Sequence, residues 1–173
     1  MSKTVSNAIR KTAKPIKKDG GGGEKVVAQN RAASYNYHLL EKMEAGMVLR
    51  GTEVKSLRDG KVMLRDAFAT VRGNAVWLLN CHIPEYLAGG PFNHEPLRPR
   101  KLLLNKLEIE KLAGKTDQKG LTIVPLRIYF RGGIAKCELA LAKGKKVWDR
   151  RQTEKDKEAR RETEDALQRY RRR

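Results

Sequence analysis

The 173-residue sequence contains little cysteine, few aromatic residues and no long apolar run. Its two cysteines, Cys81 and Cys137, are too few for a disulfide scaffold and fit a reducing compartment. No apolar stretch approaches the ~20 residues that a membrane-spanning helix needs. The basic N-terminus lacks the apolar segment of a secretory signal. We therefore expect a cytoplasmic protein that does not insert into a membrane.

Acidic residues are also scarce relative to basic ones. Lys and Arg number 38 against 20 Asp and Glu, so the net charge is +18. The excess positive charges repel one another, and this repulsion is tolerated most easily when a polyanion neutralises them. Nucleic acid is the first candidate partner, and an anionic membrane surface is the second.

The composition divides the chain into three segments. Residues 1–25 are rich in lysine and include a run of four glycines at 20–23, which predicts a disordered basic arm with a glycine hinge. Apolar alternation fills residues 26–142 and stops at Lys143, so we expect one β-rich domain there. Residues 143–173 form a basic C-terminal tail. The arm also has the basic character of an organelle transit peptide, but its proline and glycines would break the amphipathic helix that such a peptide needs.

Alternating apolar residues predict the strands of the central domain. We expect a hairpin over 67–79 that turns at Gly73 and Asn74, strands at 121–130 and 134–141, and two weaker strands at 35–42 and 46–50 around Gly46. In strand 121–130, alternation sends one set to the core, namely Val124, Leu126, Ile128 and Phe130. In strand 134–141 the predicted core set is Ala135, Cys137, Leu139 and Leu141.

Two short helices are expected between the strands. Thr52 can cap a helix at 53–58, and Asn105 with Glu108 resembles a capping box for a helix at 105–114 that ends at Gly114. Residues 81–100 are rich in Pro and Gly and are predicted to be a long surface loop. These elements predict a mainly β fold, an OB-like closed β-barrel with two or three short helices. The tail would be flexible or conditionally helical, since the apolar stripe of residues 152–170 is thin.

Two groups of exposed basic residues are candidate phosphate contacts. Arg127, Tyr129 and Arg131 share one strand face, and Lys136 lies on the neighbouring strand, so an aromatic ring for stacking would have cations around it. Lys55 and Arg58 lie three apart on one helix face. The alternative for both groups is an ordinary solvated surface.

Candidate metal and catalytic groups are sparse. Zinc is disfavoured because the possible ligands Cys81, His82, His94 and Cys137 lack the usual ligand spacing. Three carboxylates could bind magnesium in a nuclease, namely Glu41, Glu44 and Glu53, but no telling spacing joins them. We therefore expect no metal, no cofactor, no catalytic residue and no enzymatic activity.

Longer stretches of the sequence carry a family resemblance. The stretches are AQNRAA at 28–33, EAGMVLRGTEVKSLRDG at 44–60, RPRKLLLN at 98–105 and ELALAKGKKVWDRR at 138–151. In order and spacing they resemble the tmRNA-binding proteins of trans-translation, called small protein B or SsrA-binding protein. The resemblance implies an OB-like barrel with a flexible basic tail. It also implies a monomeric, non-enzymatic adaptor that brings transfer-messenger RNA to stalled ribosomes, in a pathway shared with alanyl-tRNA synthetase and the tRNA-delivering elongation factor.

The resemblance also implies which positions contact RNA. On the barrel these are Asn30, Arg31, Glu44, Lys55, Arg58, Arg100, Lys101 and Leu103, to which the residue pattern adds Arg127, Tyr129 and Lys136. In the tail, the expected contacts to the small-subunit decoding region are Lys145, Lys146, Trp148, Asp149, Arg150 and Arg151. The family more often has His or Tyr at the position of Trp148. An indole stacks on a base without needing a core; the alternative is that Trp148 folds back and plugs one end of the barrel.

Two other functions remain open at the level of sequence. A basic β-barrel could be a general ribosomal or single-stranded-RNA protein, which would not prefer a folded tRNA-like RNA. A metal-dependent nuclease acting on stalled RNA would destroy its RNA when metal is supplied.

Overall fold

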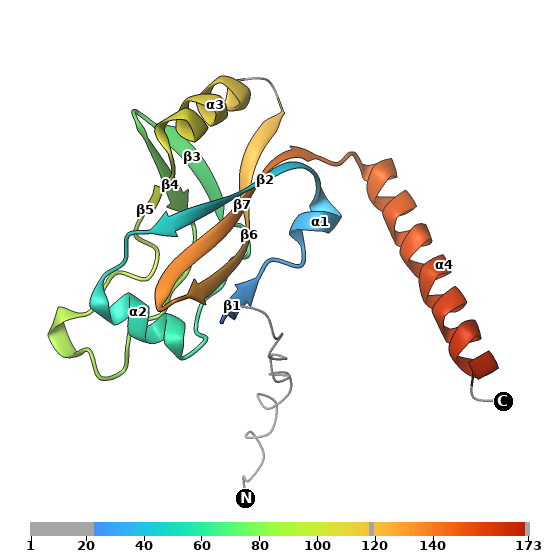
Figure 1. Cartoon of the computed structure of the whole chain (residues 1–173), viewed down its shortest axis with the longest axis horizontal. Helices are drawn as coiled ribbons and strands as arrows, with labels where there is room; N and C mark the ends of the chain where they lie inside the picture. Colours follow the sequence, from blue (N-terminus) through green and yellow to red (C-terminus); the bar gives the residue numbers. More distant parts are fainter. Residues whose placement is uncertain (1–22, 118–119, 172–173) are drawn as a thin grey trace, which may run out of the picture.

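The computed structural model describes residues 23–117 and 120–171, and its strands form one antiparallel sheet that closes into a barrel (Figure 1). The predicted N-terminal arm lies almost entirely outside the described residues. The strands are β1 (Lys25–Gln29), β2 (Tyr37–Met47), β3 (Phe68–Arg72), β4 (Ala75–Leu79), β5 (Arg100–Leu103), β6 (Leu121–Arg131) and β7 (Ile134–Gly144). The helices are α1 (Ala33–Asn36), α2 (Gly51–Arg58), the short 3-10 turn η1 (Gly90–Phe92), α3 (Lys106–Thr116) and α4 (Val147–Arg171).

The ring of strands runs β6-β3-β4-β5-β2-β7 and closes where β7 pairs with β6. β3 pairs with the first half of β6, and β1 pairs with its second half. Closure removes free strand edges. The predicted OB-like barrel is confirmed, including the hairpin of β3 and β4 and the four inward residues of β7, namely Ala135, Cys137, Leu139 and Leu141.

A β-bulge in β6 corrects the single alternation predicted for that strand. The pairing with β7 shifts between Pro125 and Arg127. Before the shift Ile123 faces the core, and after it Ile128 and Phe130 do. Val124 and Leu126 instead pack outside the barrel with Ala33 and Ala142. Proline cannot donate a ladder hydrogen bond, so a bulge is a natural place for it.

Gly46 was predicted to separate two strands, but β2 runs through it without a break. Gly46 pairs with both Leu103 and Lys136, and a Cβ at Gly46 would lie 3.3 Å from the Cβ of Leu103. The glycine therefore allows β5 to approach β2 closely, which is a known role of glycine inside strands.

The helix boundaries also differ from the prediction. α2 begins at Gly51, and Glu53 reaches back to the Arg50 N–H at 2.7 Å, so Thr52 is not the cap. Asn105 does precede α3, where Glu108 accepts the Asn105 N–H at 2.9 Å. That helix continues through Gly114 to Thr116, where Gly114 was expected to end it.

Residues 81–100 are only partly the surface loop that was predicted. Cys81, Ile83, His94 and Arg100 are buried, and β5 begins at Arg100. The His94 ring bonds Thr52 Oγ1 at 2.9 Å and the Ile83 carbonyl at 3.1 Å. The segment therefore packs against α2 because its polar side chains find partners there.

The tail forms one long helix. α4 begins just before Trp148, earlier than the predicted helical stretch, and extends away from the barrel (Figure 1). β7 continues to Gly144, two residues beyond the predicted end of the domain.

Candidate nucleic-acid interface

The outer surface of β2, β5 and β7 carries a row of residues that face solvent together. Gly46 on β2 pairs with Leu103 on β5 and with Lys136 on β7, so the three residues lie side by side across the barrel. Leu103 is 54% exposed, although leucine is usually buried. Lys101 also faces outward, two residues before Leu103. We call Glu44, Lys101, Leu103 and Lys136 the barrel face.

Glu44 joins several cations on this face. Its carboxylate accepts hydrogen bonds from Lys136 and from the Tyr129 hydroxyl, and Arg131 Nη1 lies 3.0 Å from its Oε2. The bond from Lys136 and then the one from Tyr129 lower the pKa of Glu44 below its usual value. Glu44 is therefore ionised and holds these side chains in fixed positions.

The predicted strip of Arg127, Tyr129, Arg131 and Lys136 is an internally paired network. Arg127 bonds Glu138, which raises the pKa of Arg127, and Arg131 bonds Glu24 at 2.9 Å. The two guanidinium groups lie 4.8 and 5.5 Å from the Tyr129 ring centroid. Much of the strip's positive charge is thereby neutralised.

Tyr129 is the clearest correction within that strip. Only 1% of the residue is exposed, so its ring offers no stacking surface in this conformation. Burial, followed by the bond to Glu44, raises the pKa of Tyr129 to about 12. Strand alternation correctly predicted which face of β6 carries Tyr129. It could not predict that neighbouring side chains cover the ring.

The helix α2 presents Lys55 and Arg58 to solvent, as predicted. Lys55 Nζ lies 5.3 Å from the Tyr86 ring centroid, within cation–π range. Val54 and Leu57 pack against the core. Both basic side chains are therefore available for phosphates, on a helix that is fastened to the barrel.

A buried ion-pair cluster fastens α2. Glu53 is fully buried and accepts Arg98 Nε at 2.9 Å and Arg100 Nε at 2.8 Å. Burial by itself would raise the pKa of Glu53, but the bonds from Arg98, Arg50 and Arg100 lower it. Arg100 also donates to the carbonyls of Cys81 and Pro96.

The predicted contact from Arg100 to RNA does not fit this geometry, because the whole residue is buried. Alternation along β5 explains the error, since Arg100 and Leu102 point inward while Lys101 and Leu103 point outward. Glu53 was considered as a magnesium ligand and instead serves as the partner of two arginines.

Asn30 and Arg31 lie beside α1, at the end of β2 opposite to Gly46. The Asn30 amide donates to the carbonyls of Leu64 at 3.4 Å and Pro125 at 3.2 Å, and Arg31 is exposed. These two predicted contacts therefore form a separate region from the barrel face.

The tail residues surround the start of α4. The Lys146 N–H donates to Asp149 Oδ2 at 3.2 Å, and His38 Nε2 lies 3.5 Å from the same oxygen. Lys145 Nζ donates to the Ser34 carbonyl at 3.0 Å and to Thr153 Oγ1 at 3.1 Å. Asp149 thus stabilises the first turn, as an acidic residue at a helix N-terminus does.

Trp148 is 68% exposed, which contradicts the alternative in which it plugs the barrel. Lys146 and Arg151 are exposed beside it, and the side chain of Arg150 lies outside the described part of the structure. An indole surrounded by cations is available for stacking.

The candidate metal ligands are not grouped. Across residues 23–117 and 120–171, no cluster of three or more His, Cys, Asp or Glu side chains is suited to a metal ion. Cys81 and Cys137 are buried free thiols, and burial raises the pKa of Cys81 to about 11. Within the same residues, no helix combines the length and apolarity needed to span a bilayer.

The fold is an OB-like barrel, and exposed basic side chains lie on its outer surface. These features define a class, the small β-barrel proteins with a surface suited to nucleic acid. Residues 27–169 match the SmpB family, described as SmpB protein. The chain belongs to this family.

Individual relatives agree with that assignment. The SsrA-binding protein of Carboxydothermus hydrogenoformans is 57% identical over 144 residues, which is 83% of this chain and 97% of that protein. The SsrA-binding protein of Trichodesmium erythraeum is 53% identical over 154 residues, 88% of this chain and 99% of that protein. A chain of the solved structure described as "tmRNA-SmpB: a journey to the center of the bacterial ribosome" superposes with a TM-score of 0.60 at 50% identity, covering 70% of this chain and 85% of that one.

Proposed function

We propose that this protein binds the tRNA-like part of transfer-messenger RNA and brings it to stalled ribosomes as an adaptor with no catalytic activity of its own. The match of residues 27–169 to the SmpB family carries the proposal. The relatives are named SsrA-binding proteins, which supports transfer-messenger RNA as the first partner. The description of the similar solved structure names the bacterial ribosome, which supports the ribosome as the second partner. Alanyl-tRNA synthetase and the tRNA-delivering elongation factor would act in the same pathway, in the cytoplasm.

The barrel face and α2 are the proposed tmRNA-binding surface. Lys101, Lys55 and Arg58 supply charge for phosphates, the exposed Leu103 supplies apolar contact, and Lys136 lies on the same surface in its pair with Glu44. Glu44 fixes the geometry of Lys136 and accepts hydrogen bonds only, so it could also accept a ribose hydroxyl or a base amino group. The tail would act elsewhere, with Lys145, Lys146, Trp148, Arg150 and Arg151 directed at ribosomal RNA.

A charge reversal tests the proposed surface. The double variant Lys55→Glu, Arg58→Glu should weaken tmRNA binding and reduce the slope of log affinity against log salt by roughly two units, about one per lost phosphate contact. Circular dichroism would check that the barrel remains folded. Arg72→Glu, at the exposed last residue of β3, is the control for the general loss of positive charge.

The RNA preference is the decisive part of the test. Wild-type protein should bind tmRNA more tightly than an unstructured RNA of equal length. Sequencing the RNA recovered with the tagged protein from its own cells should return tmRNA as the dominant species. Equal affinity for both RNAs would support the general single-stranded-RNA protein instead.

A further inference from the structure

The N-terminal residues of the chain carry a concentrated positive charge that the proposed tmRNA-binding surface does not include. Residues 1–22 contain six Lys and Arg against one acidic residue, Asp19, and five of the six lie at positions 10, 11, 14, 17 and 18. The first described residue is Gly23, and the match to the SmpB family begins at residue 27. This charge therefore precedes the region that the family shares.

A row of paired residues crosses the barrel and links β1 to the barrel face. Val26 on β1 pairs with Tyr129 on β6, and Tyr129 pairs with Lys136 on β7. Lys136 then pairs with Gly46 on β2, which also pairs with Leu103 on β5. The start of β1 therefore lies level with the barrel face and is separated from Lys136 by β6 alone.

Side-chain contacts hold the start of β1 between the barrel face and α2 (Figure 1). Glu24 accepts a hydrogen bond from Arg131 Nε at 2.9 Å, and Arg131 Nη1 lies 3.0 Å from the Glu44 carboxylate of the barrel face. Next in the chain, Lys25 Nζ donates to the carbonyl of Arg58, the last residue of α2, at 3.2 Å. The N-terminal residues therefore join the barrel between the two parts of the proposed tmRNA-binding surface.

The basic cluster at residues 10–18 is close enough along the chain to reach that surface. An extended chain spans at most about 3.5 Å per residue, so Lys18 lies within about 18 Å of Gly23 and Arg10 within about 45 Å. The row from Val26 to Leu103 crosses five strands and is ~19 Å wide at the usual strand spacing of ~4.8 Å. The cluster can therefore cover an RNA that lies on the barrel face.

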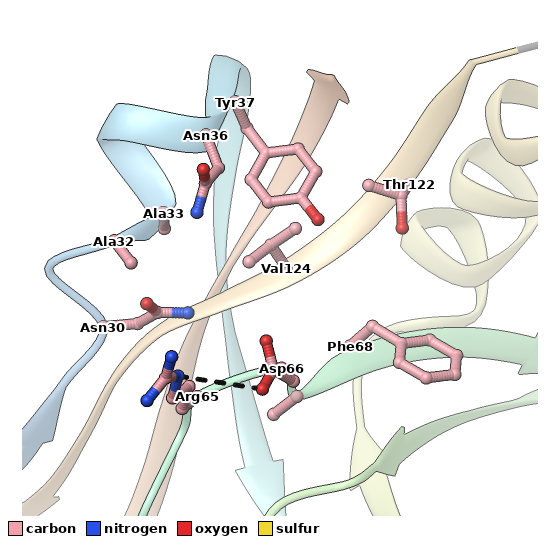
Figure 2. A pocket seen from close by; sticks show the side chains of 11 residues that line it. Asn30, Ala32, Ala33, Asn36, Tyr37, Arg65, Asp66, Phe68, Thr122 and Val124 are labelled. Carbon is pink, nitrogen blue, oxygen red and sulfur yellow. Dashed lines mark ion pairs between the residues drawn. The ribbon is translucent and has the colours of Figure 1, made fainter. Parts of the chain in front are cut away.

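A hollow at the other end of β1 belongs to a different part of the molecule. β1 runs from Lys25 to Gln29, and the next residue, Asn30, lines a hollow of about 470 Å³ between α1 and the start of β6 (Figure 2). Because β1 spans five residues at ~3.3 Å each, this hollow lies ~16 Å from the start of the strand. The barrel face and α2 are therefore the surfaces beside which the N-terminal residues join the barrel.

The composition of the cluster favours RNA over a membrane surface. A segment that binds a membrane surface needs an apolar face beside its basic one. Within residues 10–18 the apolar side chains are Ala13, Pro15 and Ile16, and proline interrupts the helix that would gather such a face. Phosphates require only positive charge, which five Lys and Arg in nine residues supply.

We propose that residues 10–18 are an additional RNA-binding segment, whose basic side chains contact phosphates of the RNA that is held on the barrel face and α2. The inference rests on the proposed function, because the tmRNA-binding surface determines where that RNA lies. Each phosphate contact releases counterions, so the segment adds affinity that depends strongly on salt. Phosphate contacts carry no sequence information, so the preference for tmRNA stays with the barrel.

A full-length glutamine variant tests this proposal. It carries Arg10→Gln, Lys11→Gln, Lys14→Gln, Lys17→Gln and Lys18→Gln. We expect it to bind tmRNA at least about tenfold more weakly than wild type at about 150 mM salt. The slope of log affinity against log salt should fall by about two to four units, at ~0.7–0.9 for each lost phosphate contact. Circular dichroism should show the same unfolding as wild type, because the substitutions precede β1.

A relocation variant is the matched control for net charge. It lacks residues 2–22 at the N-terminus and carries the same residues after Arg173, so its composition and charge equal those of wild type. Because α4 extends away from the barrel, the moved segment no longer begins beside the barrel face (Figure 1). We expect this variant to bind tmRNA as weakly as the glutamine variant does.

Wild-type affinity and salt slope in the glutamine variant would overturn the proposal, and so would full tmRNA binding by the relocation variant. Binding of wild type to phosphatidylglycerol vesicles that is lost in the glutamine variant, while tmRNA binding is kept, would indicate a membrane contact instead. In each of these cases wild-type protein should still prefer tmRNA to an unstructured RNA. The absence of that preference is the separate result that contradicts the proposed function.

Discussion

The barrel and α4 are held in place by different forces. The barrel closes through the long β6–β7 ladder and fastens α2 through Glu53, a carboxylate with no exposed surface. Contacts from α4 to the barrel include polar pairs at the surface, among them Tyr35 with Glu154 at 2.9 Å and His38 with Asp149 at 3.5 Å. The barrel has a core that determines its shape, whereas α4 begins on a few hydrogen bonds and extends away from it. Changes in the barrel core should therefore alter stability, and changes in α4 should alter function alone.

Removal of α4 should give the largest effect on function. Truncation after Lys145 keeps the Lys145 N–H bond to the Asn36 carbonyl and the whole of β7. We expect nearly unchanged tmRNA binding and unfolding, with complete loss of tagging of stalled nascent chains. The measurements are tmRNA titration and a tagging assay on the same preparation. A loss of tmRNA binding as severe as the loss of tagging would show that the two regions do not act separately.

Glu53→Gln should have the largest effect on stability. The change leaves Arg98 and Arg100 without their buried counter-charge, which is expected to lower the free energy of unfolding by about 3–5 kcal/mol. Urea unfolding followed by circular dichroism measures this. Glu110→Gln, an exposed position on α3, is the control and should stay within about 0.5 kcal/mol of wild type. Equal midpoints for the two variants would contradict a structural role for Glu53.

The substitution Trp148→Ala tests whether Trp148 at the start of α4 acts in function without supporting the barrel. Because the indole is exposed, the melting temperature should not change, while the contact to ribosomal RNA should weaken by ~1–3 kcal/mol and impair tagging. Trp148→Tyr should retain most activity, because stacking tolerates a different ring. A lowered melting temperature with normal tagging in the cold would instead indicate that Trp148 supports the barrel.

Glu41 gives the smallest expected effect, which depends on pH. Hydrogen bonds from Lys111 and then Lys115 on α3 lower its pKa from 4.5 to about 2. Because the folded-state pKa lies below the unfolded one, this stabilisation is complete above about pH 4.5 and disappears as the pH falls toward about 2. Glu41→Gln should therefore differ from wild type in urea midpoint at about pH 6, and the difference should shrink below about pH 4.5 and disappear only near about pH 2. A constant difference across this range would show that the carboxylate's charge is not involved.

Local patterns explain why much of the fold was predictable. Alternation in β7 identified its core residues, and Gly73 with Asn74 located the hairpin, because both signals depend on near neighbours. The bulge at Pro125 and the continuity of β2 through Gly46 were missed, since each depends on how strands distant in sequence pair. The family resemblance predicted the interface positions, but it could not tell that Arg100 is buried and Lys101 is exposed.

The sequence by itself determined the basic character of the protein, its barrel class and the exposed basic pair on α2, because charge and periodicity are properties of short stretches. Only the tertiary structure decided which cations are free. Arg100 pairs with Glu53, and Arg127 pairs with Glu138. In each pair the two residues are separated along the chain. Only the closed barrel likewise brings Asn30, Tyr37, Asp66 and Thr122 around one hollow. A side chain's partner depends on distances between elements, and those are set when the core packs.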